Sequence, residues 1–62
     1  MKQITIDTIV SELTDGLTYT QEQLQQIRKW LIEYQTANQL TLKQLRDLCW
    51  EDSVWIFDQI FN

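Results

Sequence analysis

The stretch from Tyr19 to Ala37 constrains the fold most, because its apolar residues recur with the period of a helix that has one buried face. Thr20, followed three residues later by Gln23, predicts a capping box at its start. Asn38 predicts its end, since asparagine tolerates the left-handed conformation that commonly terminates helices. We therefore expect one long amphipathic helix whose buried face carries Leu24, Ile27, Trp30, Leu31, Tyr34 and Ala37.

The same start pattern occurs again at Thr41 and Gln44 and predicts a second helix. We expect its buried face to carry Leu42, Leu45, Leu48 and Cys49. If this helix continued to the end of the chain, Asp52 would lie inside the apolar stripe, and burial of an unpaired carboxylate is costly. A break at residues 51–53 is therefore predicted, with Asp52 or Ser53 capping a last helix. That helix is expected to bury Val54, Ile56, Phe57, Ile60 and Phe61.

Upstream of the long helix, Asp7 predicts the N-cap of a short helix. Gly16, the only glycine of the chain, is expected to end that helix in a left-handed conformation. Residues 1–6 alternate apolar and polar side chains and allow two interpretations. One is an extended lead-in whose isoleucines rest on the helices, which we favour. The other is a strand that pairs with a second copy or with a partner's sheet edge. The short helix is expected to bury Ile9, Val10 and Leu13.

These patterns predict an all-α fold, a small compact bundle of three to four helices with an extended N-terminal lead-in. The 62 residues are expected to form a single helical domain. A chain this short hides only about 60% of the surface that its unfolded form exposes. Its single cysteine cannot form an internal disulfide. We therefore expect self-association or a partner to add stability.

Catalysis is not expected. The chain has no histidine and therefore lacks the commonest general acid–base group and metal ligand. Cys49 lies on the predicted apolar stripe, where a thiol acts as a small hydrophobic group with a raised pKa. Asp47 and Glu51 stand four residues apart, but two carboxylates alone make a weak cation site. We predict no enzyme activity, no cofactor, no metal site and no small-molecule substrate.

The chain carries no apolar run near the ~18 residues that a membrane span requires, and its first residues lack the pattern of a signal peptide. A lone thiol fits a reducing compartment, so a cytoplasmic location without membrane association is expected. The net charge of −4 argues against general attraction to nucleic-acid phosphates.

Four side chains fall outside the predicted buried stripes and are candidates for binding a partner. Trp55 and Asp58 lie on the polar side of the last helix, Trp50 lies beside the stripe of the preceding helix, and Ile32 lies on the polar side of the long helix. Large exposed apolar groups with a polar rim are typical of protein interfaces. The competing interpretation is that another segment of the chain covers them. The predicted partner-binding residues are Ile32, Trp50, Trp55 and Asp58.

The chain is accordingly predicted to be a non-catalytic protein–protein interaction module, an adaptor or inhibitor, that binds a protein partner or forms a homodimer. Two-fold dimers are the commonest assembly. The alternative is a helix-turn-helix-like nucleic-acid-binding regulator built on residues 41–60, or an acidic mimic of nucleic acid. The last helix carries no lysine or arginine for phosphates or base edges, which disfavours the first of these.

Overall fold

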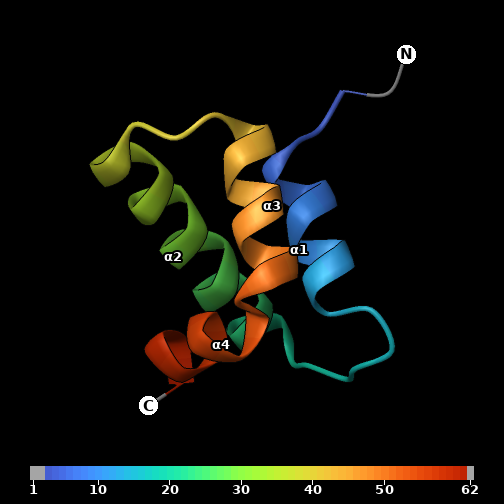
Figure 1. The fold of residues 1–62 in the computed structure, drawn as a ribbon. Coiled ribbons are helices and arrows are strands. Elements are labelled where there is room, and N and C mark those ends of the chain that lie inside the picture. The colour runs from blue at the N-terminus through green and yellow to red at the C-terminus, as the bar shows by residue number, and fades with distance from the viewer. Residues whose placement is uncertain (1–2, 62) are drawn as a thin grey trace.

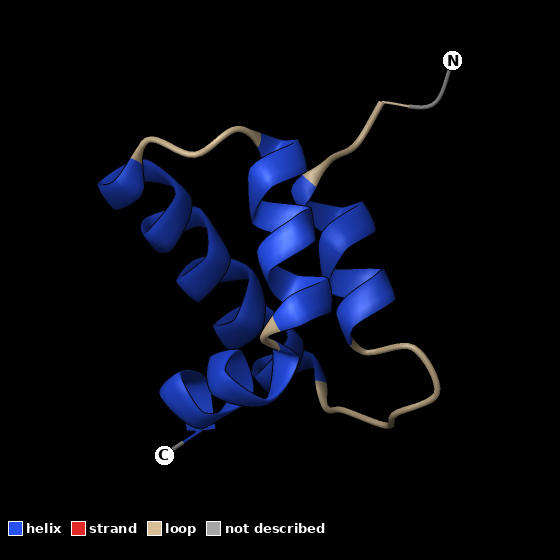
Figure 2. Cartoon of the chain, viewed as in Figure 1, coloured by secondary structure: helices blue, strands red, loops and turns tan. Residues whose placement is uncertain are grey.

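The computed structural model describes residues 3–61, and this part of the chain folds into four α-helices without a strand. All connections between the helices are short, and the longest bulges away from the bundle between the first two helices (Figure 2). The all-α bundle with a lead-in is confirmed. The helices are α1 (Ile6–Leu13), α2 (Gln21–Asn38), α3 (Leu42–Glu51) and α4 (Ser53–Phe61).

The helices form a bundle whose described residues extend 28 × 26 × 20 Å. α1 and α3 lie side by side, and α2 packs against both (Figure 1). α4 crosses one end of the bundle and packs against α2 and α3, so that α1 and α4 contact each other least. Each helix contributes to a common core of fully buried side chains, namely Ile9, Ile27, Leu31, Leu45, Cys49 and Ile56.

Both predicted capping boxes are present. The Thr20 backbone N–H donates to Gln23 Oε1 over 2.9 Å, and the Gln23 N–H donates to Thr20 Oγ1 over 3.2 Å. At the start of α3 the Thr41 N–H donates to Gln44 Oε1 over 2.9 Å, and the reciprocal bond measures 3.1 Å. A local sequence motif was sufficient to place these helix starts because each cap involves only neighbouring residues.

The prediction for the start of α1 is wrong. Thr5, not Asp7, is the N-cap, and its hydroxyl accepts a hydrogen bond from the Thr8 N–H over 3.2 Å. The Asp7 carboxylate instead pairs with Arg28 of α2, with an Nη1–Oδ1 distance of 2.9 Å. A helix start two residues earlier leaves Asp7 in the first turn, where a negative charge remains favourable.

The lead-in is only partly covered by the structure, since Met1 and Lys2 lie outside the described residues. Residues 3–5 have no regular structure, and Ile6 already belongs to α1, so no strand is formed between residues 3 and 6. Ile4 and Ile6 pack against the core, as the lead-in interpretation predicts.

The predicted end of α2 near Asn38 is confirmed, whereas Gly16 lies beyond the end of α1 that it was expected to form. α1 ends at Leu13, and Gly16 has its positive φ of 77° in the turn that follows. That turn is closed by the Leu17 N–H donating to the Thr14 carbonyl over 3.0 Å. α2 does end at Asn38, but the left-handed residue is the next one, Gln39, with φ 52°.

The predicted break in the C-terminal half is confirmed. α3 ends at Glu51 and α4 begins at Ser53, with only Asp52 between them. The Asp52 N–H donates to the Leu48 carbonyl over 2.8 Å, and its carbonyl accepts from Ile56 N–H over 3.0 Å, so one residue closes both helices through its backbone. Neither Asp52 nor Ser53 makes a side-chain cap within residues 3–61.

Three residues predicted to be buried are exposed. Ala37 lies in the last turn of α2 and is exposed. Val54 is 82% exposed and Phe61 is also exposed, although Ile56 is fully buried and Phe57 and Ile60 pack against the core. The bend at Asp52 rotates α4 so that only the Ile56 side faces inward, which the spacing of apolar residues could not specify.

Candidate interaction surfaces

The four predicted partner-binding residues do not form one surface. Trp55 lies on the side of α4 that faces α2, where its ring meets two others edge-on. The ring centroids of Trp55 and Trp30 are 6.0 Å apart at 72°, and those of Trp55 and Tyr34 are 6.0 Å apart at 70°. Trp30 and Tyr34 are themselves stacked at 4.8 Å. These three rings form an aromatic cluster between α2 and α4, and Trp55 is its outer member, 43% exposed.

Ile32 is exposed as predicted but lies away from this cluster. It stands two residues from both Trp30 and Tyr34 in α2, which places it about 160° around the helix from each of them. Asp58 is exposed three residues after Trp55 and therefore near it on α4. Ile32 and the Trp55–Asp58 pair thus occupy different sides of the bundle, and their role in binding stays a prediction.

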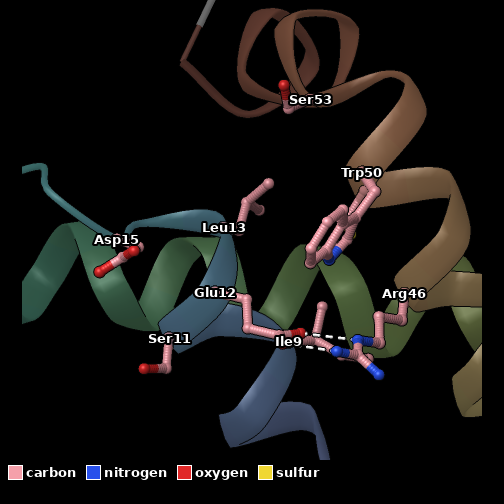
Figure 3. A pocket seen from close by; sticks show the side chains of 9 residues that line it. Ile9, Ser11, Glu12, Leu13, Asp15, Arg46, Trp50 and Ser53 are labelled. Carbon is pink, nitrogen blue, oxygen red and sulfur yellow. Dashed lines mark hydrogen bonds and ion pairs between the residues drawn. The ribbon is translucent and has the colours of Figure 1, made fainter.

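Trp50 is 69% exposed and lines a groove between α1 and α3 that we call the α1–α3 groove. The groove has a volume of about 550 Å³, and the first residue of α4, Ser53, is among those that line it. Figure 3 shows the Trp50 ring reaching from α3 toward α1, with Leu13 across from it. The residues that line the groove are Ile9, Ser11, Glu12, Leu13, Asp15, Arg46, Cys49, Trp50 and Ser53.

An ion pair joins the two walls of the groove. Arg46 Nε and Nη2 donate to the two carboxylate oxygens of Glu12 over 2.8 and 2.7 Å (Figure 3). The Arg46 guanidinium also lies 5.7 Å from the centroid of the Trp50 ring, within the range of a cation–π contact. This bidentate geometry fixes the arginine and neutralises it locally. Sequence reasoning missed the pair because Glu12 and Arg46 are 34 residues apart and no local motif links them.

Cys49 forms part of the buried floor of the groove and is only 3% exposed. Burial, followed by the negative charge of Glu12, raises the pKa of the Cys49 thiol from its ordinary value of 9.0 to about 11. At neutral pH the group is therefore a protonated thiol without nucleophilic character. The prediction that Cys49 is a buried apolar group is confirmed.

A second set of rings, which the sequence did not suggest, lies at the start of α2 and along α4. Tyr19 stacks on Phe57 at 6.0 Å and on Phe61 at 5.9 Å, and the two phenylalanines are 6.2 Å apart. Val54 stands one turn before Phe57 on the same side of α4. We call Val54, Phe57, Phe61 and Tyr19 the C-terminal apolar face. The only sequence signal for it is the spacing of residues 54, 57 and 61, which we assigned to the core.

The described residues contain no group of three or more acidic or thiol side chains arranged to hold a metal ion. Nor is any helix in residues 3–61 both long enough and apolar enough to cross a membrane. Comparisons of the chain with family models, with curated proteins and with solved structures find no match.

Proposed function

We propose that this chain is a non-catalytic protein–protein interaction module, an adaptor or inhibitor that acts by occupying a surface of another protein. One observation carries the proposal: Trp50 and Val54, on either side of the bend between α3 and α4, are 69% and 82% exposed. A domain of this size has little stability to spare, and large apolar groups held in water are typical of binding surfaces. Tryptophan is also among the residues that most often anchor protein interfaces.

The chemistry of the described residues supports a binding role over a catalytic one. The sequence has no histidine, and the single thiol is buried with a raised pKa. The groove beside Trp50 is lined by an ion pair, by the carboxylate of Asp15 and by small or apolar side chains, rather than by a nucleophile with an adjacent base.

The nucleic-acid alternative gains no support from the geometry. The connection between α3 and α4 is the single residue Asp52, whereas a helix-turn-helix uses a turn of about three to four residues. α4, which would enter the groove of DNA, carries Asp58 and no basic residue.

The test is a comparison of wild type with the double variant Trp50→Ala/Val54→Ser. Each protein is examined by sedimentation equilibrium for self-association and is used as bait for affinity purification from the native host. Both substituted side chains are exposed, so we expect the variant to fold, and circular dichroism checks this. We expect wild type to bind a second copy or a foreign protein that the variant loses. The proposal fails if wild type is monomeric and every captured protein binds the variant equally well.

A further inference from the structure

α4 begins differently from the other three helices of residues 3–61. α1, α2 and α3 each start with a threonine whose side chain accepts a backbone hydrogen bond, whereas no side chain caps the start of α4. The N–H groups of residues 53–55 also make no backbone hydrogen bond to α3. Because the first N–H groups of a helix lack partners within it, α4 gains hydrogen bonds if α3 is extended into it.

The hinge between α3 and α4 is the single residue Asp52. Its φ of −125° and ψ of 38° compare with about −63° and −42° in a regular α-helix. Its N–H donates to the Leu48 carbonyl and its carbonyl accepts from the Ile56 N–H, and both bonds span four residues, as in a continuous helix. Rotation about φ and ψ of Asp52 can therefore join α3 and α4 into one helix over residues 42–61 while keeping both bonds.

Straightening the hinge also aligns the most exposed apolar side chains. Trp50 and Val54 lie on either side of the bend and are 69% and 82% exposed. In a single helix they stand one turn apart and about 40° apart around the axis, and Phe57 and Phe61 continue the same stripe. This spacing of four, three and four residues is typical of the seam along which two helices pack.

Within one chain, straightening would remove α4 from its binding site. Ile56 would leave the core, and the Trp55 ring would leave those of Trp30 and Tyr34. A second copy with the same extended helix has the same site empty, with every partner of α4 in the matching arrangement. α4 of each copy can then make in the other copy the contacts that it makes in its own. The contacts of α4 therefore select a second copy as the partner.

We propose that two copies of this chain exchange α4, each copy extending α3 into one long helix and placing its α4 on α2 of the other. Exchange of an identical element is a low-cost route to a dimer, because the contacts of the monomer are reused. The two hinge regions lie against each other, so that Trp50 and Val54 are covered. The inference rests on the proposed function, since it names a second copy as the partner of that exposed surface.

The test combines sedimentation equilibrium with nuclear magnetic resonance of mixed chains. Isotopically labelled and unlabelled copies of the full chain are unfolded together in urea and refolded at high concentration. The ring centroids of Trp55 and Trp30 are 6.0 Å apart, so their protons are close enough for nuclear Overhauser effects. We expect a dimer in which the Trp55 ring of a labelled copy gives these effects to the Trp30 ring of an unlabelled copy.

Asp52→Ala and Asp52→Gly form a matched pair of hinge variants. Both remove a carboxylate that would lie beside the apolar stripe of a continuous helix, but alanine favours that helix about fivefold over glycine. A dimer contains two hinges, so the dissociation constant of the Asp52→Ala dimer should be about 25-fold lower than that of Asp52→Gly.

Gln59→Ala and Gln59→Gly are the control pair, because Gln59 is exposed on α4 and stays helical in both the monomer and the exchanged dimer. Their dimer dissociation constants should agree with each other. Circular dichroism checks that all four variants fold.

The proposal is overturned if wild type stays monomeric at its highest soluble concentration, if the Trp55–Trp30 contacts of a dimer lie within one chain, or if the two Asp52 variants dissociate alike. A monomeric wild type that captures a host protein through Trp50 and Val54 would overturn the exchange and support the proposed function. A dimer with contacts of α4 within each chain that Trp50→Ala/Val54→Ser dissociates would do the same. If wild type is monomeric and no host protein depends on these two residues, the inference and the proposed function fail together.

Discussion

Trp55 and Trp50 stand five residues apart and look alike in the sequence, yet they occupy different environments. The Trp55 ring contacts the rings of Trp30 and Tyr34, so most of its partners are supplied by α2. Within residues 3–61 the Trp50 ring stacks on no other ring; the Arg46 guanidinium lies 5.7 Å from its centroid, and the ring lines the α1–α3 groove. The bend at Asp52 separates them, because it turns α4 onto α2 and leaves Trp50 on the last turn of α3, which lies beside α1. A tryptophan outside an apolar stripe is therefore not evidence for an interface until its neighbours are known.

The largest effect should come from Trp30→Ala, which removes the centre of the aromatic cluster that holds Trp55. Trp30 stacks on Tyr34 and meets Trp55 edge-on, so we expect a loss of about 3 kcal/mol in the free energy of unfolding. In a domain this small that loss should leave much of the protein unfolded. Circular dichroism with a urea titration measures it. A variant that melts with wild type would show that α4 does not depend on the cluster.

The α1–α3 groove that Trp50 lines can be tested through Cys49, which is buried at the base of the groove. The folded pKa of about 11 lies above the ordinary 9.0, so on raising the pH the unfolded chain loses the thiol proton first. The stability that this group contributes is complete below about pH 9 and is lost as the pH rises through about 11, on the order of 2 kcal/mol. Urea titrations of wild type and Cys49→Ala across this range measure the difference.

Cys49→Ala is the control because it differs from wild type only by the absence of the thiol. Identical pH dependence of the two would contradict a raised thiol pKa. Below pH 8 the native thiol should also react slowly with a thiol reagent and react quickly in denaturant. Fast native labelling would mean that the floor of the α1–α3 groove is open to water.

Trp55→Ala should cost about 1 to 2 kcal/mol, because it deletes two edge-to-face ring contacts and leaves the Trp30–Tyr34 stack intact. The sequence-based hypothesis that Trp55 anchors a homodimer predicts a different result, a shift from dimer to monomer with helix content unchanged. Sedimentation equilibrium with circular dichroism separates the two. Lower stability without a change in association would place the role of Trp55 within the chain.

Thr20→Ala and Thr41→Ala should each cost about 1 kcal/mol, since each removes one half of a capping box. One cap starts the helix that carries the partners of Trp55, and the other starts the helix that carries Trp50. Equal losses would show that the two tryptophan environments differ in packing and not in the strength of their helices. Thr36→Ala, in the last turns of α2, is the control and should melt close to wild type.

The smallest effect should come from Trp50→Ala, with a change below about 0.5 kcal/mol in the free energy of unfolding. The ring is 69% exposed, so its removal exposes little that was buried. Thermal melts of this variant beside Trp55→Ala give the direct comparison. If Trp50→Ala proves the more destabilising of the two, the assignment of one tryptophan to the fold and the other to binding is reversed.

The sequence by itself determined where the helices lie. The Thr20 and Thr41 caps, the end of α2 at Asn38 and the break at Asp52 depend on residues within a few positions of one another, and short-range hydrogen bonding and the 3.6-residue period fix them. The burial of Cys49 followed for the same reason, since it lies on the stripe of a single helix. The start of α1 was misplaced because Thr5 and Asp7 are both good N-caps and the sequence contains nothing that ranks them.

Only the tertiary structure decided which side chains of different helices contact each other and which apolar side chains stay exposed. The pairing of Glu12 with Arg46 depends on how α1 packs against α3. The contact of Trp55 with α2 and the exposure of Val54 depend on the angle at which α4 leaves Asp52. That angle is set by packing among all four helices, because burying Ile56 against the core fixes the rotation of α4 and forces Val54 outward. Long-range packing of this kind has no local sequence signal, and it is what created both the aromatic cluster and the open α1–α3 groove.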